Sequence, residues 1–157
     1  MNLENGTWVV VADGEKYLLL RNKGDQDFLH LEVVDHAASP NAPAHELSSD
    51  RSGRQHDATR DVSGQVESWG KSAMEETDWH RVAETRFADE LAGKLKDWAA
   101  SGRFRHLVIV ADPRSLGTMR KAYDDALRSV IVAEIDKDLT NLPLDGIEAS
   151  IKAYNAG

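Results

Sequence analysis

Residues 104–112 read FRHLVIVAD, and this stretch decides the fold class. The run from Leu107 to Ala111 is apolar at every position, which is typical of a central strand covered by helices on both faces. Asp112 and Pro113 follow at once, and an Asp cap before a proline is a common beginning of a helix. The sequence therefore predicts a buried strand that leads directly into a helix.

The clearest helical pattern lies just before this strand, over residues 79–101. Large apolar residues recur there at intervals of three and four, and charged residues fill the other faces, as in an amphipathic helix. The apolar residues are Phe87, Leu91, Leu95 and Trp98. Asp78 is the expected N-cap of this helix, and Gly102 is its expected end.

Three further elements are expected after the central strand. A helix beginning at Pro113 directs four apolar residues inward at helical spacing. These residues are Leu116, Met119, Tyr123 and Leu127. The stretch SVIVAEID at residues 129–136 predicts a strand, and LDGIEASIKAYNA at residues 144–156 predicts a C-terminal helix.

The first third of the chain has the pattern of antiparallel strands. TWVVVADG, at residues 7–14, is rich in β-branched residues and ends in Asp-Gly, a frequent hairpin turn. KYLLLRN follows at residues 16–22, and FLHLEVVD at residues 28–35 alternates apolar with polar residues. With the later elements, this order predicts one α/β fold: a mixed sheet of about five strands, first an antiparallel meander and then parallel strands joined by helical crossovers.

Residues 36–78 interrupt this regular pattern. They contain prolines, glycines and many Ser and Asp residues, but few large apolar side chains. Segments without regular structure that exceed about 12–15 residues are uncommon in compact domains and are usually functional or disordered. We therefore expect a single domain over residues 1–157, with a long mobile loop at about residues 36–78.

The overall composition limits the class of partner. The chain of 157 residues carries a net charge of −8 and no cysteine, so disulfides and thiolate metal sites are excluded. Non-specific binding to duplex DNA depends on neutralised phosphates and is disfavoured; only a local basic patch would support binding to nucleic acid. The N-terminus has no signal-peptide pattern and no long apolar run follows, so a cytoplasmic protein without membrane contact is expected. No glycine-rich nucleotide motif predicts a cofactor.

Several stretches together resemble the host attachment family, described as proteins required for attachment to host cells. In family order they are WVVVADGEKYLLL, SDRSGRQ, RFADELAGKL, LVIVADPRSLGTMR and EIDKDLT, and they cover most of the chain. That family is similar to release-factor-like proteins of bacteria and archaea, and to the middle domain of class 1 peptide-chain release factors. The resemblance implies a domain of ribonuclease-H-like topology.

In those release factors, the middle domain carries a Gly-Gly-Gln tripeptide on a long loop. The loop enters the peptidyl-transferase centre and helps water to attack peptidyl-tRNA. It precedes a helix that starts near an Arg-Phe pair, here Arg86-Phe87, and the nearest match to the tripeptide is Gly53-Arg54-Gln55. Because arginine resists the positive φ that glycine permits, the resemblance implies a loop in a related position and not the release activity itself.

This loop supplies the main candidate residues. The resemblance implies that a ribosome or another RNA–protein assembly is contacted through residues 49–60, where guanidinium groups suit phosphates and carboxylates. The candidate binding residues of the loop are Arg51, Gly53, Arg54, Gln55 and Arg60. The alternative is a solvated polar loop whose arginines pair with neighbouring aspartates. Arg114 and Arg120 are further candidates for an anion at the helix that follows Asp112.

The predicted function is an interaction protein and not an enzyme, which affects attachment to host cells indirectly because the chain carries no export signal. Two enzymatic alternatives are open. A hydrolase of peptidyl-tRNA-like esters would use Gln55, with His56 and His80 as acid or base. A metal-dependent nuclease would bind Mg²⁺ at strand ends, through Asp13, Asp112 and Asp136. A turn, a helix cap and a strand exit explain the same aspartates, so no metal site is predicted.

Overall fold

The computed structural model describes residues 1–40 and 62–154, and it describes side chains for all of these except residues 62–77. One sheet of five strands has the order β3-β2-β1-β4-β5. The strands are β1 (Trp8–Ala12), β2 (Lys16–Asn22), β3 (Leu31–Ala38), β4 (Leu107–Ala111) and β5 (Ile131–Ile135). β1 pairs antiparallel with β2 and β2 with β3, whereas β4 is parallel to both β1 and β5. The predicted mixed α/β fold is confirmed.

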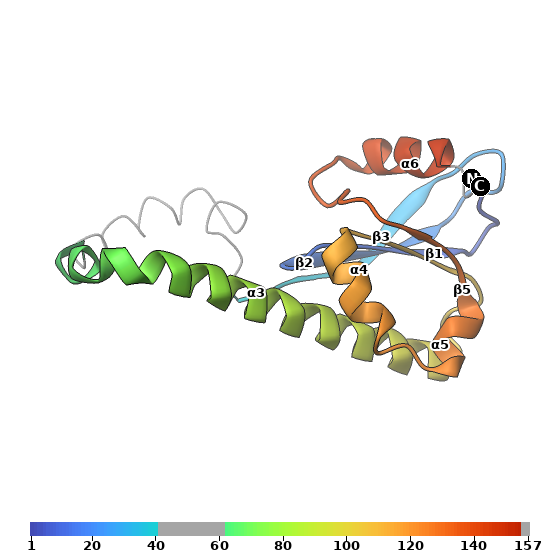
Figure 1. The fold of residues 1–157 in the computed structure, drawn as a ribbon. Helices are drawn as coiled ribbons and strands as arrows, with labels where there is room; N and C mark the ends of the chain where they lie inside the picture. Colours follow the sequence, from blue (N-terminus) through green and yellow to red (C-terminus); the bar gives the residue numbers. More distant parts are fainter. Residues whose placement is uncertain (41–61, 155–157) are drawn as a thin grey trace.

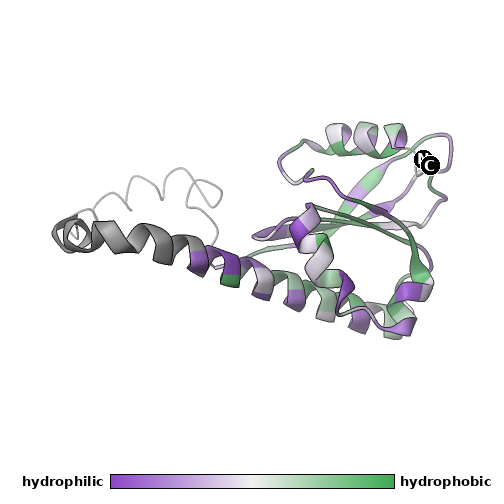
Figure 2. Ribbon diagram, viewed as in Figure 1, coloured by the Kyte–Doolittle hydropathy of each residue, from purple (hydrophilic) through white to green (hydrophobic). Residues whose placement is uncertain are grey.

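The strands alternate their side chains between two apolar layers, one on each face of the sheet. On one face Val10 and Ile109 pack with residues of three helices: α3 (Val62–Ala100), α4 (Pro113–Arg120) and α5 (Asp125–Val130). On the other face Val9 and Val108 pack beneath α6 (Leu144–Ala153). Figure 1 shows α6 on the opposite side of the sheet from the other helices, and Figure 2 shows hydrophobic residues gathered in the strands. The stretch at residues 104–112 is therefore central, as its composition predicts.

α3 begins at Val62 and not near Trp79, so the boundaries predicted for the loop at residues 36–78 are wrong at both ends. β3 continues to Ala38, and the helix includes the second half of the predicted loop. The remaining residues 41–61 lie outside the described part of the chain. The error has a physical cause: an apolar stripe marks only the part of a helix that packs on a core, and the first buried side chain described in α3 is Ala88.

α3 is much longer than the face that it covers. At 1.5 Å per residue its 39 residues extend for about 58 Å. Figure 1 shows the first half of α3 projecting past the sheet, while its second half lies beneath the strands. Gly102, with φ of 81°, follows the helix in the left-handed conformation, as expected for a glycine that ends a helix.

The single helix predicted after Pro113 is two helices in the structure. The Asp112 carboxylate accepts a hydrogen bond from the Ser115 backbone N–H and caps α4, as predicted. A second cap at Asp124, which accepts from the Leu127 N–H, starts α5. Leu116, Met119 and Leu127 remain buried on the same core. The apolar spacing is thus preserved, and the break between the helices is set by the second capping aspartate.

Candidate functional site

The residues of the predicted binding loop lie outside the described part of the chain. These are Arg51, Gly53, Arg54, Gln55, His56 and Arg60. Among the predicted site residues, His80, Arg114 and Arg120 are described, and each lies on a helix. Their surroundings decide what each of them can contribute.

His80 lies on the projecting part of α3 and is exposed. Close to it, Trp79 is 57% exposed and Val82 is 47% exposed, so large apolar side chains face solvent on this part of the helix. A shallow hollow runs along the same part of α3 and is lined by Arg81, Val82, Thr85, Arg86 and Asp89. Within the described residues, no ion pair engages either arginine of this hollow. The projecting helix therefore combines exposed apolar groups with available positive charge.

Arg120 is engaged by its own protein. Its Nε and Nη2 lie 3.0 Å and 2.9 Å from Glu134 Oε1, and the Tyr123 hydroxyl donates to Glu134 Oε2 at 2.7 Å. Arg114 is less constrained, since its Nη1 is 3.7 Å from Glu84 Oε1 and its side chain is 60% exposed. Binding of an external anion by Arg120 would require exchange with Glu134, whereas Arg114 could turn toward a partner.

Burial, followed by the hydrogen bond to Glu134, raises the pKa of Tyr123 above its ordinary value of 10.0. The folded protein therefore keeps this phenol protonated at a pH where the unfolded chain loses the proton. The contribution of Tyr123 to the free energy of unfolding is present below pH 10. It falls as the pH rises above 10, by up to about 1.4 kcal/mol per pH unit. At neutral pH we expect the free energy of unfolding of the Tyr123→Phe variant to be about 1 kcal/mol lower, because the hydrogen bond to Glu134 is removed.

Between pH 9 and pH 11 the variant is expected to lose less stability than the unmodified protein. Urea denaturation at both pH values measures the difference. The raised pKa of Tyr17, which burial also causes, is unchanged in the variant and cancels in the comparison. Equal losses of stability between pH 9 and pH 11 in the two proteins would contradict the assignment of this pH dependence to Tyr123.

The three aspartates proposed for a metal do not form a common site in the structure. Asp13 Oδ1 accepts from the N–H groups of Glu15 and Lys16 in the β1–β2 turn, and its Oδ2 accepts from the Thr140 hydroxyl at 2.8 Å. Asp112 caps α4, and Asp136 is exposed after β5. Within residues 1–40 and 62–154, no group of three or more His, Cys, Asp or Glu residues is arranged to hold a metal ion. The nuclease alternative therefore rests on the strand-end positions of the three aspartates alone.

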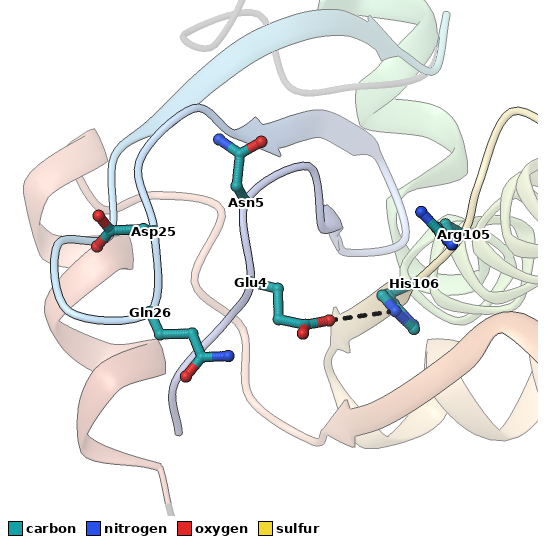
Figure 3. A pocket seen from close by; sticks show the side chains of 6 residues that line it. All are labelled: Glu4, Asn5, Asp25, Gln26, Arg105 and His106. Carbon is teal, nitrogen blue, oxygen red and sulfur yellow. Dashed lines mark ion pairs between the residues drawn. The ribbon is translucent and has the colours of Figure 1, made fainter.

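A hollow with a volume of about 710 Å³ lies at the edge of the sheet where β1 and β4 begin. It is lined by Glu4, Asn5, Asp25, Gln26, Arg105 and His106 (Figure 3). In Figure 3 the side chains of Glu4 and His106 point toward each other, and their ion pair measures 3.3 Å. Both side chains are substantially exposed, so this ion pair contributes little to stability. The lining carries both signs of charge, and it suits polar contacts better than it suits an enclosed reaction.

Sequence reasoning missed the surroundings of this hollow. Arg103 and Arg105 flank Phe104 in the connection between α3 and β4, and Arg21 on β2 lies over the ring of Trp8. The alternation of arginine and aromatic residues at 103–105 was a signal for a binding surface in the sequence. The contribution of Arg21 depends on strand pairing, since Arg21 pairs with Trp8 only in the folded sheet.

None of the helices in the described residues combines the length and the apolar character needed to cross a membrane.

Comparison with known proteins gives a family for this architecture. A part of the chain is 31% identical, over 55 residues, to "Uncharacterized protein RP470" of Rickettsia prowazekii (strain Madrid E). That match spans 35% of this chain and 37% of the relative, so about a third of each protein is compared. The family described as "Bacterial archaeo-eukaryotic release factor family 12" matches residues 6–151, which include every strand and nearly all of α6. The chain thus belongs to bacterial archaeo-eukaryotic release factor family 12.

Proposed function

We propose that this protein is a release-factor-like interaction module that binds the ribosome, or another RNA–protein assembly, through residues 49–60. The family assignment over residues 6–151 supports the class of partner. The observation that carries the proposal is α3, because the segment with Gly53-Arg54-Gln55 leads directly into the end of this helix that projects from the sheet.

The geometry of α3 supports contact at a distance from the sheet. Pro40 lines one small cavity together with Phe87, so the chain leaves β3 beside the middle of α3. The helix axis from Val62 to Phe87 is about 38 Å long at 1.5 Å per residue. A rigid helix that ends well beyond the core is suited to carry a contact segment into a larger assembly.

Individual arginines, and not the net charge, would contact an RNA-containing partner, because residues 41–61 carry three arginines and four acidic residues. The chain as a whole is acidic, with a net charge of −8, so attraction to phosphates must come from local groups. Arg51, Arg54 and Arg60 occupy the segment before α3, and Arg81 and Arg86 lie on the exposed helix. Trp79 adds an exposed aromatic face, which could stack on a base or an apolar side chain. Arg51 and Arg54 would hold the partner, and Gln55 would orient the bound group.

A hydrolase that acts on peptidyl-tRNA-like esters is the second candidate, favoured by the glutamine at the third position of Gly53-Arg54-Gln55. Arginine replaces the second glycine of the release-factor tripeptide and restricts the backbone there. For this reason we place binding first and hydrolysis second. An effect on attachment to host cells would then be indirect, as a consequence of a contact inside the cell.

Replacement of Arg51 and Arg54 by alanine tests the binding function. We expect co-sedimentation with purified ribosomes to weaken by about tenfold or more, because each lost phosphate contact is worth roughly one unit in the salt slope and on the order of 1 kcal/mol. The matched control is Arg128→Ala with Lys137→Ala, which removes the same charge from α5 and from the segment after β5. Equal binding of the two double variants would contradict the proposal.

The Gln55→Ala variant separates the two candidate functions in the same preparation. For a binding module, ribosome co-sedimentation depends on the arginines, and peptidyl-tRNA is not hydrolysed by the unmodified protein. Hydrolysis that disappears in the Gln55→Ala variant would instead assign the enzymatic function.

A further inference from the structure

Aromatic rings gather at the corner of the fold where α3 ends and β1 and β4 begin. Trp8 and Trp98 both pack edge-on against Phe104, with ring centroids 5.6 Å and 6.0 Å apart. Trp8 starts β1, Trp98 lies in the last turn of α3, and Phe104 lies in the connection to β4. Because Trp8 and Phe104 are buried, the corner is rigid and can hold polar groups above it.

Two arginines lie over these rings. The guanidinium carbon of Arg21 is 5.5 Å from the centroid of Trp8, and that of Arg103 is 5.0 Å from the centroids of both Trp8 and Trp98. Both arginine residues are exposed. A guanidinium held by its face against an indole keeps its N–H donors at its edges, and it loses less entropy when these donors bind a ligand. The rings thus fix the position of two sets of donors.

Neither guanidinium group pairs with a carboxylate in the described residues, whereas some other cations of the chain do. Lys23 pairs with Glu32, Arg114 with Glu84 and Arg120 with Glu134. Across residues 1–40 and 62–154, no ion pair engages Arg21, Arg103 or Arg105. In a chain with 27 acidic and 19 basic side chains, this is a local excess of positive charge.

The Arg21 guanidinium lies beside the backbone of Gly6. Gly6 has φ of 86°, and a Cβ placed there would lie 3.9 Å from Arg21 Nη2. Arg21 and Arg103 both lie over the ring of Trp8, so two positively charged side chains meet at one aromatic residue. A purely structural role for Arg21 and Arg103 would require only that they stack on the rings. It would not require that their guanidinium N–H groups lack a carboxylate partner.

We propose that Arg21 and Arg103, with Arg105 beside them, form a second binding surface that takes the phosphate groups of an RNA backbone. Planar guanidinium forks match phosphate oxygens, and fixed arginines on phosphates position a protein on nucleic acid without reading its sequence. The choice of RNA rests on the proposed function, which supplies an RNA-containing partner. The surface lies at the end of α3 opposite to Val62, so it would form a separate contact from that of residues 49–60.

The test uses the full chain and a short RNA hairpin labelled with a fluorophore. We expect saturable binding to the hairpin at 50 mM salt, and a loss of about tenfold in affinity for Arg21→Gln with Arg103→Gln. The slope of log K against log salt should fall by about two, one for each lost phosphate contact. Arg21→Lys with Arg103→Lys keeps both charges but not the forks, and its affinity should lie between the other two.

Two controls make the result specific. Arg128→Gln with Lys137→Gln removes the same charge elsewhere and should leave the affinity within twofold. Circular dichroism and thermal unfolding establish that the variants are folded. Absence of hairpin binding, or an equal loss in the Arg21/Arg103 and the control variants, overturns the inference.

Ribosome co-sedimentation of the same variants separates this inference from the proposed function. If the Arg51/Arg54 variant alone loses ribosomes and the Arg21/Arg103 variant still binds the hairpin, the proposed function stands without the second surface. If binding to the RNA hairpin depends on Arg21 and Arg103 while no form of the protein sediments with ribosomes, the second surface stands and the proposed function fails.

Discussion

Leu95→Ala is expected to lower the free energy of unfolding by about 2–5 kcal/mol, the range for a leucine removed from a packed core. Leu95 has no exposed surface, and it lies in the apolar layer that joins α3 to the sheet together with Leu91, Ile109 and Met119. The substitution removes apolar contacts and leaves a cavity that the surrounding strands can only partly fill.

Asp97→Ala on the same helix is the matched control for Leu95→Ala. Asp97 is exposed, so its replacement should change the stability by no more than about 0.5 kcal/mol. Urea denaturation followed by circular dichroism gives both values. A loss below about 1 kcal/mol for Leu95→Ala would show that the second half of α3 is not anchored as described, and the projecting half would then lack a rigid base.

The core elements of this fold could be predicted because their residues are selected by burial. The strand at Leu107–Ala111 and the hairpin at Asp13-Gly14 are visible in the sequence, and the structure confirms both. Gly14 also shows a limit of such reasoning. A Cβ at Gly14 would come within 2.6 Å of the Glu84 side chain, so this glycine is required by the approach of α3 as well as by the turn. That contact joins distant parts of the sequence.

The first half of α3 could not be predicted from apolar spacing, because helical periodicity marks the face that packs on the core. In α3 the apolar stripe runs from Phe87 to Trp98, in the second half of the helix. The break between α4 and α5 was also missed, since the apolar spacing from Leu116 to Leu127 continues across it. In both cases the pattern reported which residues are buried and did not report where the backbone changes direction.

The same limit of sequence reasoning applies to the candidate site residues. Arg120 was selected as a basic residue of the helix that follows Asp112, but tertiary packing gives it Glu134 as a partner. Asp13 was selected as a strand-end carboxylate, and local turn hydrogen bonds use it instead. Arg21 was not selected, because only the pairing of β1 with β2 brings it over Trp8. Side chains whose partners are distant in sequence require the fold before their role can be seen.

Replacing residues 45–61 by a Gly/Ser spacer of equal length is expected to have the largest effect on function. The spacer removes Arg51, Arg54 and Arg60 while it leaves the described sheet and helices intact. A flexible Gly/Ser chain of this length can still join β3 to α3. Loss of several phosphate contacts at once should weaken ribosome binding by on the order of a hundredfold or more at physiological salt. Unfolding should occur at nearly the same temperature, because the core is unchanged.

Sedimentation of the intact and spacer-bearing proteins with purified ribosomes measures this most directly. The central claim is that a rigid α/β domain carries one arginine-containing segment to an RNA–protein partner. It predicts that the intact protein is found with the ribosomes and that the spacer-bearing protein, folded to the same extent, stays in the supernatant. Equal amounts of the two proteins in the ribosome pellet, or neither protein in it, would contradict the claim.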